Sequence, residues 1–325
     1  MTNKEQMNPL VSVIMPTYNT GEFLSEAIDS VLTQELTNLE LIIINDGSTD
    51  NTESIINKYN DPRIRVINKQ NQGLSAARND AIDIAQGQYL SFLDADDRWK
   101  PAKLLEEQKI FDSEPSVGLI FSNFVRFNHT GIYPETQFDF YQGINDIPYR
   151  QSQSGIGQVV TVPAFESFIR LYDFPAWTQV ITVKRDVFGN LRFRDVKRDE
   201  KGRLALLEDL SLIPIIFSMT DIAYIREPMA EVRRHDNNST KDLSYIKVAI
   251  LNSLLCLEDG SLSKDNRKAL NNRIARQYMS VGVYYAKEKF VIKALASYFK
   301  GLFRGRILAF FKRVILLPVD YFGNQ

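Results

Sequence analysis

The sequence predicts an α/β fold, and two observations carry this prediction. Over the first 125 residues, short apolar runs alternate with segments of helical periodicity, which is the pattern of successive βαβ units. The run from Leu41 to Ile44 is apolar without a break, as is typical of a parallel strand that is buried on both faces of its sheet. We therefore expect a central sheet that is flanked by helices.

The elements of this alternation can be assigned in order. Five apolar runs are expected to be strands, and they cover residues 10–15, 39–44, 64–67, 89–93 and 117–121. Four segments of helical periodicity lie between them and cover residues 22–33, 51–59, 75–86 and 101–112. Asp50 with Glu53 has the spacing of a capping box ahead of the second helix, and Pro101 suits the first turn of the fourth.

The following part of the chain is less regular. Residues 128–163 lose the periodicity and are rich in Gly, Gln, Tyr and Asp, which predicts long loops or an insertion. A strand is expected over residues 177–183 and a helix over residues 204–219.

The length of 325 residues suggests about two domains. After Leu243 the pattern is helical almost to the end of the chain, so we place a boundary near Thr240. This divides the chain into a domain of residues 1–240 and a helical region of residues 241–325.

The composition excludes several classes of function. The 39 basic and 40 acidic residues leave a formal charge of -1, so the bulk charge needed to attract nucleic acid is absent. The single cysteine, Cys256, excludes a disulfide within the chain and favours a reducing compartment. With two histidines, a hard cation held by oxygen atoms is favoured over zinc. The first eight residues do not resemble a secretory signal and no apolar run reaches the roughly 20 residues that span a bilayer, so we expect a cytoplasmic protein.

Acidic and polar residues follow two of the expected strands. Asn45 and Asp46 follow the second strand, and Asp94, Asp96 and Asp97 follow the fourth. Small molecules bind at the carboxyl ends of parallel strands, where helix N-termini offer N–H groups to phosphates. Three carboxylates within four residues repel one another unless a cation or hydrogen bonds offset their charge, so Mg²⁺ or Mn²⁺ beside a nucleotide is one explanation. An acidic turn that caps the next helix is the other.

Four motifs follow one another in the first hundred residues: Pro9–Asn19, Asn45–Asp50, Gly73–Asn79 and Phe92–Asp97. Together they resemble glycosyltransferase family 2, whose members invert the anomeric centre and have the GT-A fold. Further along the chain, Glu208-Asp209 is similar to the acidic pair of that family and Arg233-Arg234-His235 to its late arginine–histidine loop. The resemblance implies a Rossmann-like mixed central sheet flanked by helices, with a helical C-terminal region.

The resemblance also implies a donor site made of residues that match these motifs. Its members would be Pro16 and Tyr18 at the nucleobase, Asp46 at the edge of the base, Arg78 at the nucleotide, Asp94 at the ribose and Asp96 at a metal ion, Mn²⁺ or Mg²⁺. The residue types suit these roles, because a carboxylate accepts hydrogen bonds from N–H and O–H groups and an aromatic ring stacks on a base.

An inverting transfer needs a base that removes the proton of the attacking hydroxyl, and the resemblance nominates Asp209. Glu208 is the alternative. Neighbouring helical positions point about 100° apart, so only one of the two should face the sugar. Both carboxylates could instead stabilise the N-terminus of the helix that follows them.

Three more residues are expected near this site. His235 would bind the metal ion or contact the diphosphate, and Arg234 beside it would bind the donor. An ordinary surface histidine is the alternative. Trp177 would stack on a donor or acceptor sugar, although a tryptophan is more often simply packed.

The function that the resemblance implies is that of a metal-dependent hexosyltransferase of bacterial surface-polysaccharide synthesis. It would move a sugar from a nucleotide diphosphate donor, a UDP-sugar in the first place, to a hydroxyl of a glycan or lipid-linked acceptor. The alternative is a catalytically silent protein that binds sugar nucleotides or serves as a scaffold. A dinucleotide-dependent oxidoreductase is disfavoured because the turn from Pro16 to Gly21 lacks the G-x-G-x-x-G pattern.

The C-terminal residues carry a local excess of positive charge. Residues 287–313 contain eight basic residues and one acidic residue, which is a local charge of +7. Apolar residues recur at helical spacing from Phe303 to Leu317. This helix either lies on an anionic surface, such as the inner face of the cytoplasmic membrane, or packs on the catalytic domain or a second subunit.

Overall fold

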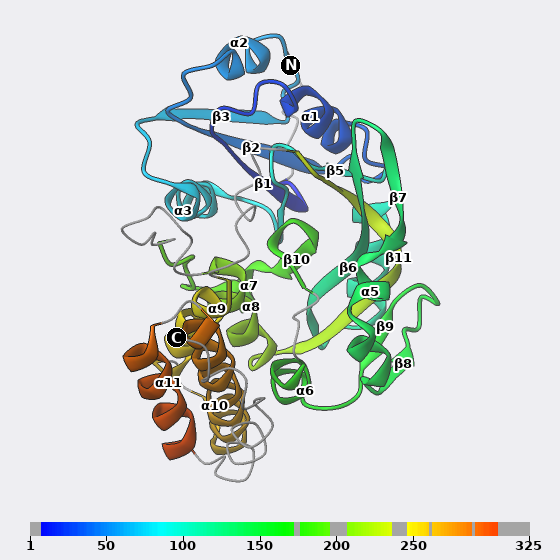
Figure 1. Cartoon of the computed structure of the whole chain (residues 1–325). Helices are drawn as coiled ribbons and strands as arrows, with labels where there is room; N and C mark the ends of the chain where they lie inside the picture. Colours follow the sequence, from blue (N-terminus) through cyan, green and yellow to red (C-terminus); the bar gives the residue numbers. More distant parts are fainter. Residues whose placement is uncertain are drawn as a thin grey trace.

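The computed structural model describes residues 8–171, 176–195, 207–235, 246–259, 262–287 and 290–304. These residues form a mixed sheet with helices on both of its faces and a group of helices at one end (Figure 1). The strand order is β3-β2-β1-β4-β10-β6-β11-β9-β8, with β5 (Arg98–Trp99) paired to β11 and β7 paired to β6. The predicted α/β fold with a mixed central sheet is confirmed.

The first half of the sheet is parallel, as predicted. Its strands are β1 (Val11–Thr17), β2 (Leu39–Asp46), β3 (Ile64–Lys69) and β4 (Tyr89–Phe92). Every residue of β1 and β2 is buried, which explains why their sequences are almost continuously apolar. Polar residues stand at the carboxyl ends of both strands and at one position near each start, where Ser12 Oγ donates a hydrogen bond to Glu40 Oε1 at 2.6 Å.

The four helices expected in this half are present, with ends that differ by a few residues: α1 (Leu24–Leu32), α2 (Thr52–Ile56), α3 (Leu74–Ile84) and α4 (Lys103–Ser113). The two predicted start signals are wrong in detail. Asn51 is the N-cap of α2, and Asp50 accepts hydrogen bonds from the N–H groups of Thr52 and Gly21 instead of closing a capping box. Pro101 lies two residues before α4 begins.

The second half of the sheet mixes strand directions. β10 (Ile181–Lys184) is antiparallel to β4 and to β6 (Val117–Asn128), whereas β11 (Asp221–Arg233) runs parallel to β6. The strand expected over residues 177–183 is only partly right, because Thr178–Val180 forms the 3₁₀ turn η2. β11 was not expected, because its register against β6 shifts on both sides of Pro228 and breaks the alternation of apolar residues.

Residues 128–163, expected as long loops or an insertion, contain regular structure. They form β7 (Gly131–Thr136), α5 (Gln137–Phe140), η1 (Gln142–Asp146), β8 (Tyr149–Gln151) and β9 (Gln158–Val160). The loop alternative is wrong because almost every residue of β7 and every residue of β8 is exposed, so neither strand has an apolar face that a sequence pattern would reveal.

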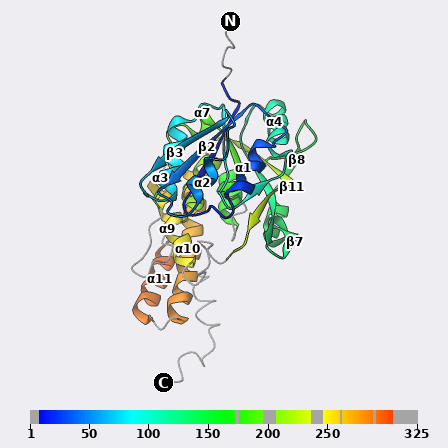
Figure 2. The same ribbon diagram turned by 90° about the horizontal axis from the view of Figure 1, so that it is seen from above.

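The remaining helices gather beyond the central strands. They are α6 (Ala164–Arg170), α7 (Arg185–Phe188), α8 (Glu208–Phe217), α9 (Ile246–Cys256), η4 (Leu257–Asp259), α10 (Lys264–Lys287) and α11 (Val291–Phe303). The helix expected over residues 204–219 corresponds to α8. In Figure 2, α10 and α11 lie side by side and extend away from the sheet. The boundary near Thr240 and the tail from residue 305 onward lie outside the described residues.

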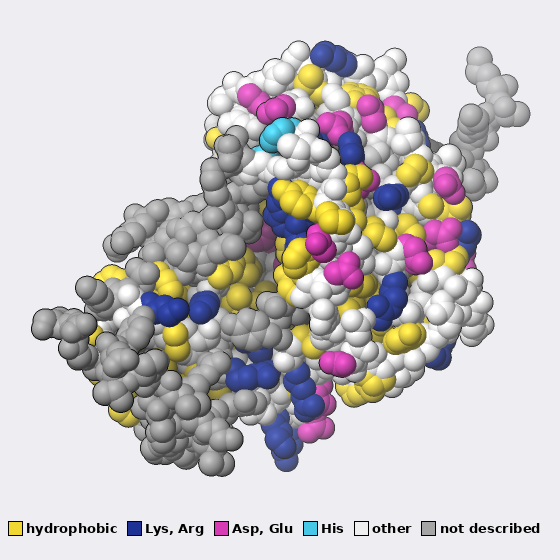
Figure 3. All heavy atoms as spheres, turned by 45° about the vertical axis from the view of Figure 1, so that its right-hand side comes forward, with side chains coloured by type: hydrophobic (Ala, Val, Ile, Leu, Met, Phe, Trp, Pro, Cys, Tyr) yellow, Lys and Arg dark blue, Asp and Glu magenta, His cyan; other side chains and the backbone are white. Residues whose placement is uncertain are grey.

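The hydrophobic core lies on both faces of the sheet, and β2 shows this most clearly. Ile42 and Ile44 belong to the cluster that packs against α3, α8 and α10, while Leu41 and Ile43 belong to the cluster that packs against α1 and α4. On the surface, charges of both signs are interspersed with hydrophobic side chains, as the face in Figure 3 shows. This agrees with the near-zero net charge of the chain.

Candidate active site

Two loops that are distant in the sequence meet beyond the carboxyl end of β4. The first carries Asp96 and Asp97, and the second carries Arg233 and His235 at the end of β11. His235 Nε2 lies 3.0 Å from Asp96 Oδ2. The backbone N–H of Arg233 donates to Asp97 Oδ1 at 2.7 Å, and Arg233 Nε donates to the carbonyl oxygen of Asp96 at 2.9 Å. The structure therefore brings together the two motifs that the sequence associates with a metal ion.

The two carboxylates of this loop have different environments. Asp97 is buried, and burial together with the charges of Asp96 and Asp94 raises the pKa of Asp97 well above its usual range. The side chain of Asp96 is 22% exposed. Asp96 is therefore the more accessible of these two carboxylates for a cation from solvent.

Asp96 and His235 fit a divalent metal ion. Two ligand atoms that lie about 2.1 Å from an ion, with a right angle between their bonds to it, are about 3 Å apart. Asp96 Oδ2 and His235 Nε2 have this spacing. The described residues contain no group of three or more His, Cys, Asp or Glu side chains placed to hold an ion. The other ligands would then be water or phosphate oxygens. An imidazole ligand suits Mn²⁺ better than Mg²⁺, which prefers oxygen.

Arg78 of α3 joins two acidic motifs of the site. Its side chain is 2% exposed, and its guanidinium donates to Asp94 Oδ1 at 2.7 Å and to Glu208 Oε1 at 3.1 Å. The ring of Phe193 covers the guanidinium, with 5.2 Å between Cζ and the ring centre. Burial opposes the charge, but the two carboxylates raise the pKa of Arg78 further, so it is always a cation. Arg78 thus positions both motifs, and its contact with a nucleotide stays a prediction.

Asp209 adjoins Glu208 at the start of α8 but has a different partner. The hydroxyl of Thr178 donates a hydrogen bond to Asp209 Oδ1, whereas Glu208 is held by Arg78. Burial and the charge of Glu208 raise the pKa of Asp209 to about 7. A carboxylate with a pKa near neutrality that is oriented by one hydroxyl is suited to accept a proton.

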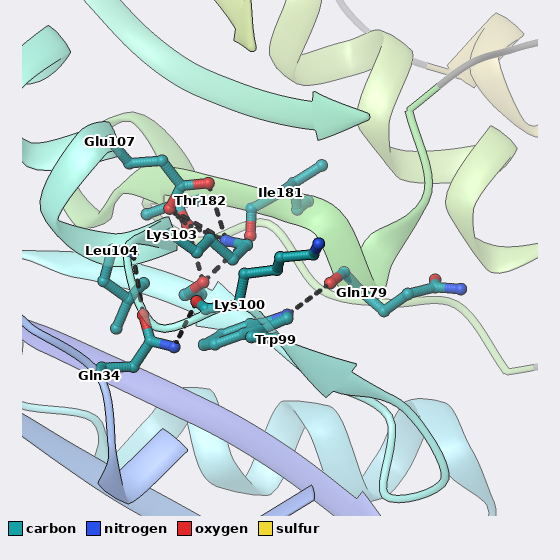
Figure 4. A network of polar contacts seen from close by, with 10 residues as sticks. Gln34, Trp99, Lys100, Lys103, Leu104, Glu107, Gln179, Ile181 and Thr182 are labelled. Carbon is teal, nitrogen blue, oxygen red and sulfur yellow. Dashed lines mark hydrogen bonds and ion pairs between the residues drawn. The ribbon is translucent and has the colours of Figure 1, made fainter. Parts of the chain in front are cut away.

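A buried polar network fixes η2, the turn that carries Thr178, the hydrogen-bond partner of Asp209 (Figure 4). Trp99 Nε1 donates to the carbonyl oxygen of Gln179 at 3.0 Å. Lys103 Nζ lies 4.3 Å from the centre of the Trp99 ring and 2.8 Å from Glu107 Oε1, and Glu107 accepts a hydrogen bond from Thr182 Oγ1 at 2.7 Å. Burial lowers the pKa of Lys103 and raises the pKa of Glu107.

The residues expected at the nucleobase lie on the first strand and its turn. Pro16 is buried in β1, while Tyr18 just beyond it is 49% exposed. Asn19 ties this turn to the loop after β2, because its Oδ1 accepts from the N–H of Thr49 at 2.7 Å and its own N–H donates to Ser48 Oγ at 3.0 Å. Tyr18 therefore offers an exposed ring on a turn that is held in place.

Asp46 lies at the end of β2 and is 3% exposed. Its carboxylate oxygens accept hydrogen bonds from the backbone N–H groups of Gln72 at 2.9 Å and Gly73 at 2.7 Å. Asp46 therefore shapes the loop that leads into α3. Each carboxylate oxygen has a second lone pair, so the predicted contact with a base remains open to it.

Trp177 and Arg234, both expected near a sugar or donor, lie together. Cζ of Arg234 is 5.7 Å from the centre of the Trp177 ring, and Phe124 packs 5.1 Å from the same ring. Arg126 of β6 also approaches this ring, at 5.8 Å. Arg126 and Thr178 were not expected at the site, because neither belongs to a motif and the only signal for Thr178 in the sequence is its place beside Trp177.

Comparison with known proteins identifies the N-terminal half of the chain. Residues 12–170 match the model of the family described as "Glycosyl transferase family 2". The chain is 43% identical over 127 residues to the "Putative teichuronic acid biosynthesis glycosyltransferase TuaG" of Bacillus subtilis (strain 168), and the match covers 38% of this chain and 49% of that relative. The chain thus spans about half the length of this relative.

Solved structures match over most of the chain. Residues 1–349 of TarS from S. aureus, in complex with UDP-GlcNAc, have a TM-score of 0.63 at 16% identity, with 90% of this chain and 81% of that chain covered. The mannosyltransferase PcManGT from Pyrobaculum calidifontis, in complex with GDP-Man and Mn²⁺, has a TM-score of 0.58 at 17% identity, with 97% and 83% covered. At such identities the likeness concerns the fold.

Proposed function

Because residues 12–170 form a glycosyltransferase family 2 domain within a GT-A fold, we propose that this chain is an inverting transferase that moves a sugar from a nucleotide diphosphate to a hydroxyl group. The observation that carries the proposal is the pairing of Arg78 with both Asp94 and Glu208. This arginine links the acidic loop after β4 to the start of α8. A donor bound at the loop would lie beside the proton acceptor of α8.

In the proposed reaction, the acceptor hydroxyl attacks the anomeric carbon from the face opposite the diphosphate. Asp209 removes the proton of that hydroxyl as the new bond forms, and the nucleotide diphosphate leaves with the electrons of the broken bond. Thr178 orients Asp209, and Arg78 holds the adjacent Glu208 in a different direction. With a pKa of about 7, Asp209 is ionised in about half of the molecules at neutral pH.

We assign a divalent cation to Asp96 and His235. When bound there, it would offset the negative charge of the departing diphosphate. Arg233 holds the loop of Asp96 through two hydrogen bonds, so both ligand side chains are positioned before an ion arrives. The Mn²⁺ in PcManGT supports a divalent ion, and the imidazole favours Mn²⁺ over Mg²⁺.

For the donor we propose a UDP-sugar. UDP-GlcNAc in the TarS structure and GDP-Man in PcManGT support a sugar linked to a nucleoside diphosphate as the class. The side chains assigned to this donor are Pro16 and Tyr18 at the base, Asp46 at its edge, Asp94 at the ribose and Arg78 at the nucleotide. Arg234 and Trp177 are assigned to the border between donor and acceptor, where Arg234 would be close to the diphosphate and Trp177 to a sugar.

The acceptor is proposed to be a glycan or lipid-linked saccharide of a bacterial surface polysaccharide. The relative named for teichuronic acid biosynthesis supports this class of pathway. Assembly of such glycans on a lipid would place the reaction at the inner face of the cytoplasmic membrane. Among the described residues, no helix is long and apolar enough to cross a bilayer.

Helix α11 offers a surface for contact with such a membrane. One face packs on α10, where Ala294 and Tyr298 form a small core with Met279. The opposite face exposes large apolar side chains at helical spacing, namely Ile292 (84% exposed), Leu295 (52%) and Phe299 (55%). We propose that this face lies on an anionic lipid surface, to which the basic residues of the 287–313 stretch are attracted.

Hydrolysis of nucleotide sugars tests the proposed activity without knowledge of the acceptor. The full chain is incubated with Mn²⁺ and a panel of UDP- and GDP-sugars, and free nucleotide diphosphate is measured. We expect slow release from at least one UDP-sugar, which stops when the metal is chelated. Binding of UDP without turnover of any donor would indicate the catalytically silent protein instead.

A further inference from the structure

Beside the proposed sugar site, aromatic rings and guanidinium groups from four separate segments alternate. Phe140 belongs to α5, Arg126 to β6, Trp177 precedes η2 and Arg234 follows β11. Cζ of Arg126 lies 4.7 Å from the centre of the Phe140 ring and 5.8 Å from that of Trp177, and Cζ of Arg234 lies 5.7 Å from that of Trp177. We name these four side chains the arginine–aromatic wall.

Two members of the wall, Trp177 and Arg234, adjoin residues proposed to act in the reaction. Trp177 immediately precedes the threonine whose hydroxyl binds Asp209. Arg234 immediately precedes the histidine whose Nε2 lies 3.0 Å from Asp96. A ligand that lies against the wall would therefore be next to the proposed base on one side and to the proposed donor on the other.

Within the part of the chain that the structure describes, neither arginine of the wall forms an ion pair with a carboxylate. The negative charge that acts on Arg234 is that of buried Asp97, which Asp94 and Asp96 also surround. Arg126 donates to the neutral amide of Gln137, and its Nη1 is a buried atom without a hydrogen-bond partner among those residues. Burial and the charge of Arg234 both lower the pKa of Arg126. By contrast, the neighbouring arginines 98 and 233 are each paired with a glutamate. An anion between the two wall arginines would remove their repulsion.

We propose that the arginine–aromatic wall binds an acidic acceptor, that is, a saccharide that carries a phosphate or a carboxylate close to its reacting hydroxyl. The proposal rests on the transferase activity proposed above. The rings of Trp177 and Phe140, of which Phe140 is 58% exposed, would stack on the apolar face of a sugar. The planar guanidinium groups of Arg126 and Arg234 match the two oxygens of a carboxylate or phosphate. A neutral acceptor would leave the repulsion between the two arginines in place.

The test uses the full chain saturated with UDP and Mn²⁺, so that the donor site is filled. The probes are methyl glucoside, methyl glucuronide and glucose 6-phosphate, which share a sugar ring and differ in charge. The chain has two tryptophans, and Trp99 is 4% exposed, so a change in emission on probe binding reports on Trp177. We expect one or both anionic probes to bind at least about tenfold more tightly than methyl glucoside. Which anion is preferred distinguishes a carboxylate from a phosphate in the acceptor.

Variants assign this preference to the wall. Arg126→Gln should abolish the preference for anions and leave UDP affinity within about twofold. Arg126→Lys keeps the charge but not the planar fork, so it should lose part of the preference. Arg226→Gln is the matched control, because Arg226 also lies over aromatic rings, those of Tyr149 and Tyr224 at 5.8 Å. This variant should keep the preference for anionic probes.

Two results would overturn the proposal. Equal affinity of the wild-type chain for neutral and anionic probes would show that the wall does not select an anion. Loss of UDP affinity in Arg126→Gln and Arg126→Lys would place the arginine in the donor site. Donor hydrolysis is measured on the same samples: a wild-type chain that hydrolyses donor without preferring anions refutes the wall alone, whereas a chain that hydrolyses none refutes the transferase activity.

Discussion

Arg78 Nη1 donates a hydrogen bond to Glu208 Oε1 at 3.1 Å, although 130 residues separate the two in the sequence. The pair distinguishes the two adjacent carboxylates of α8. Glu208 has its charge offset by a buried cation, whereas Asp209 accepts the hydroxyl of Thr178 and has a pKa of about 7. Of the two candidates for the base, Asp209 is the one that Arg78 does not hold by an ion pair, and a pKa near neutrality suits the role.

Asp209→Asn should lower turnover about a hundredfold or more and leave UDP affinity almost unchanged, since a general base acts in the transition state. Glu208→Gln is the matched variant at the next position. It removes a charge that balances Arg78, so it should lower the free energy of unfolding by about 1–3 kcal/mol and reduce turnover less than Asp209→Asn does. Steady-state kinetics measures the turnover of both variants, and urea unfolding measures their free energies of unfolding. Turnover that survives in Asp209→Asn but not in Glu208→Gln would exchange the two roles.

The rate should depend on pH through Asp209, which must be ionised to accept a proton. Its pKa is raised to about 7, so the ionised fraction grows from about one tenth at pH 6 to about nine tenths at pH 8. We therefore expect kcat/KM to rise about tenfold over this range and to level off above it. In Asp209→Asn the residual rate should lose this inflection. A wild-type profile that is flat between pH 6 and pH 8 would show that the base titrates elsewhere.

The first half of the sheet could be predicted because its strands are buried on both faces and leave continuous apolar runs, as in β2. The acidic residues after β4 could also be predicted, because they follow the end of an apolar strand directly in the sequence. β7 and β8 could not be predicted, because they are held by pairing with neighbouring strands and expose almost all of their side chains.

Of the site residues too, those that belong to a motif could be predicted and those placed only by packing could not. Asp96 and His235 belong to motifs and were expected together, and they lie 3.0 Å apart. The partner of Asp209 was not expected, because Thr178 lies 31 residues earlier in a turn whose position depends on the buried contact of Trp99 with Gln179. Contacts that arise only when distant segments pack together leave no local pattern in the sequence.

The buried pair of Lys103 and Glu107 should contribute to stability through its balance of charge. Lys103→Met leaves the Glu107 carboxylate buried without its cation, so the free energy of unfolding should fall by about 3–5 kcal/mol. The double variant Lys103→Met with Glu107→Leu removes both charges and should recover much of this loss. Urea unfolding measures both effects. A single variant within about 1 kcal/mol of the wild type would contradict a charge-balancing role.

Contact of α11 with a membrane is tested by sedimentation with vesicles of anionic and of neutral lipid. The wild-type chain should bind anionic vesicles, and high salt should weaken the binding. Ile292→Glu combined with Phe299→Glu should weaken it at least about tenfold and leave UDP affinity unchanged. Met219→Glu is the control, because Met219 is 53% exposed but lies outside α11. A double variant that binds vesicles normally, or that turns a dimer into a monomer, would identify the face as something other than a lipid contact.

Titration calorimetry of UDP, with and without Mn²⁺, tests most directly whether Asp96 and His235 form a metal-dependent donor site. For the wild-type chain we expect Mn²⁺ to raise UDP affinity at least about tenfold. Asp96→Asn should abolish this gain, and His235→Gln should reduce it for Mn²⁺ more than for Mg²⁺. UDP affinity that responds equally to Mn²⁺ in the wild type and in Asp96→Asn, or UDP that does not bind at all, would contradict the assignment of this site.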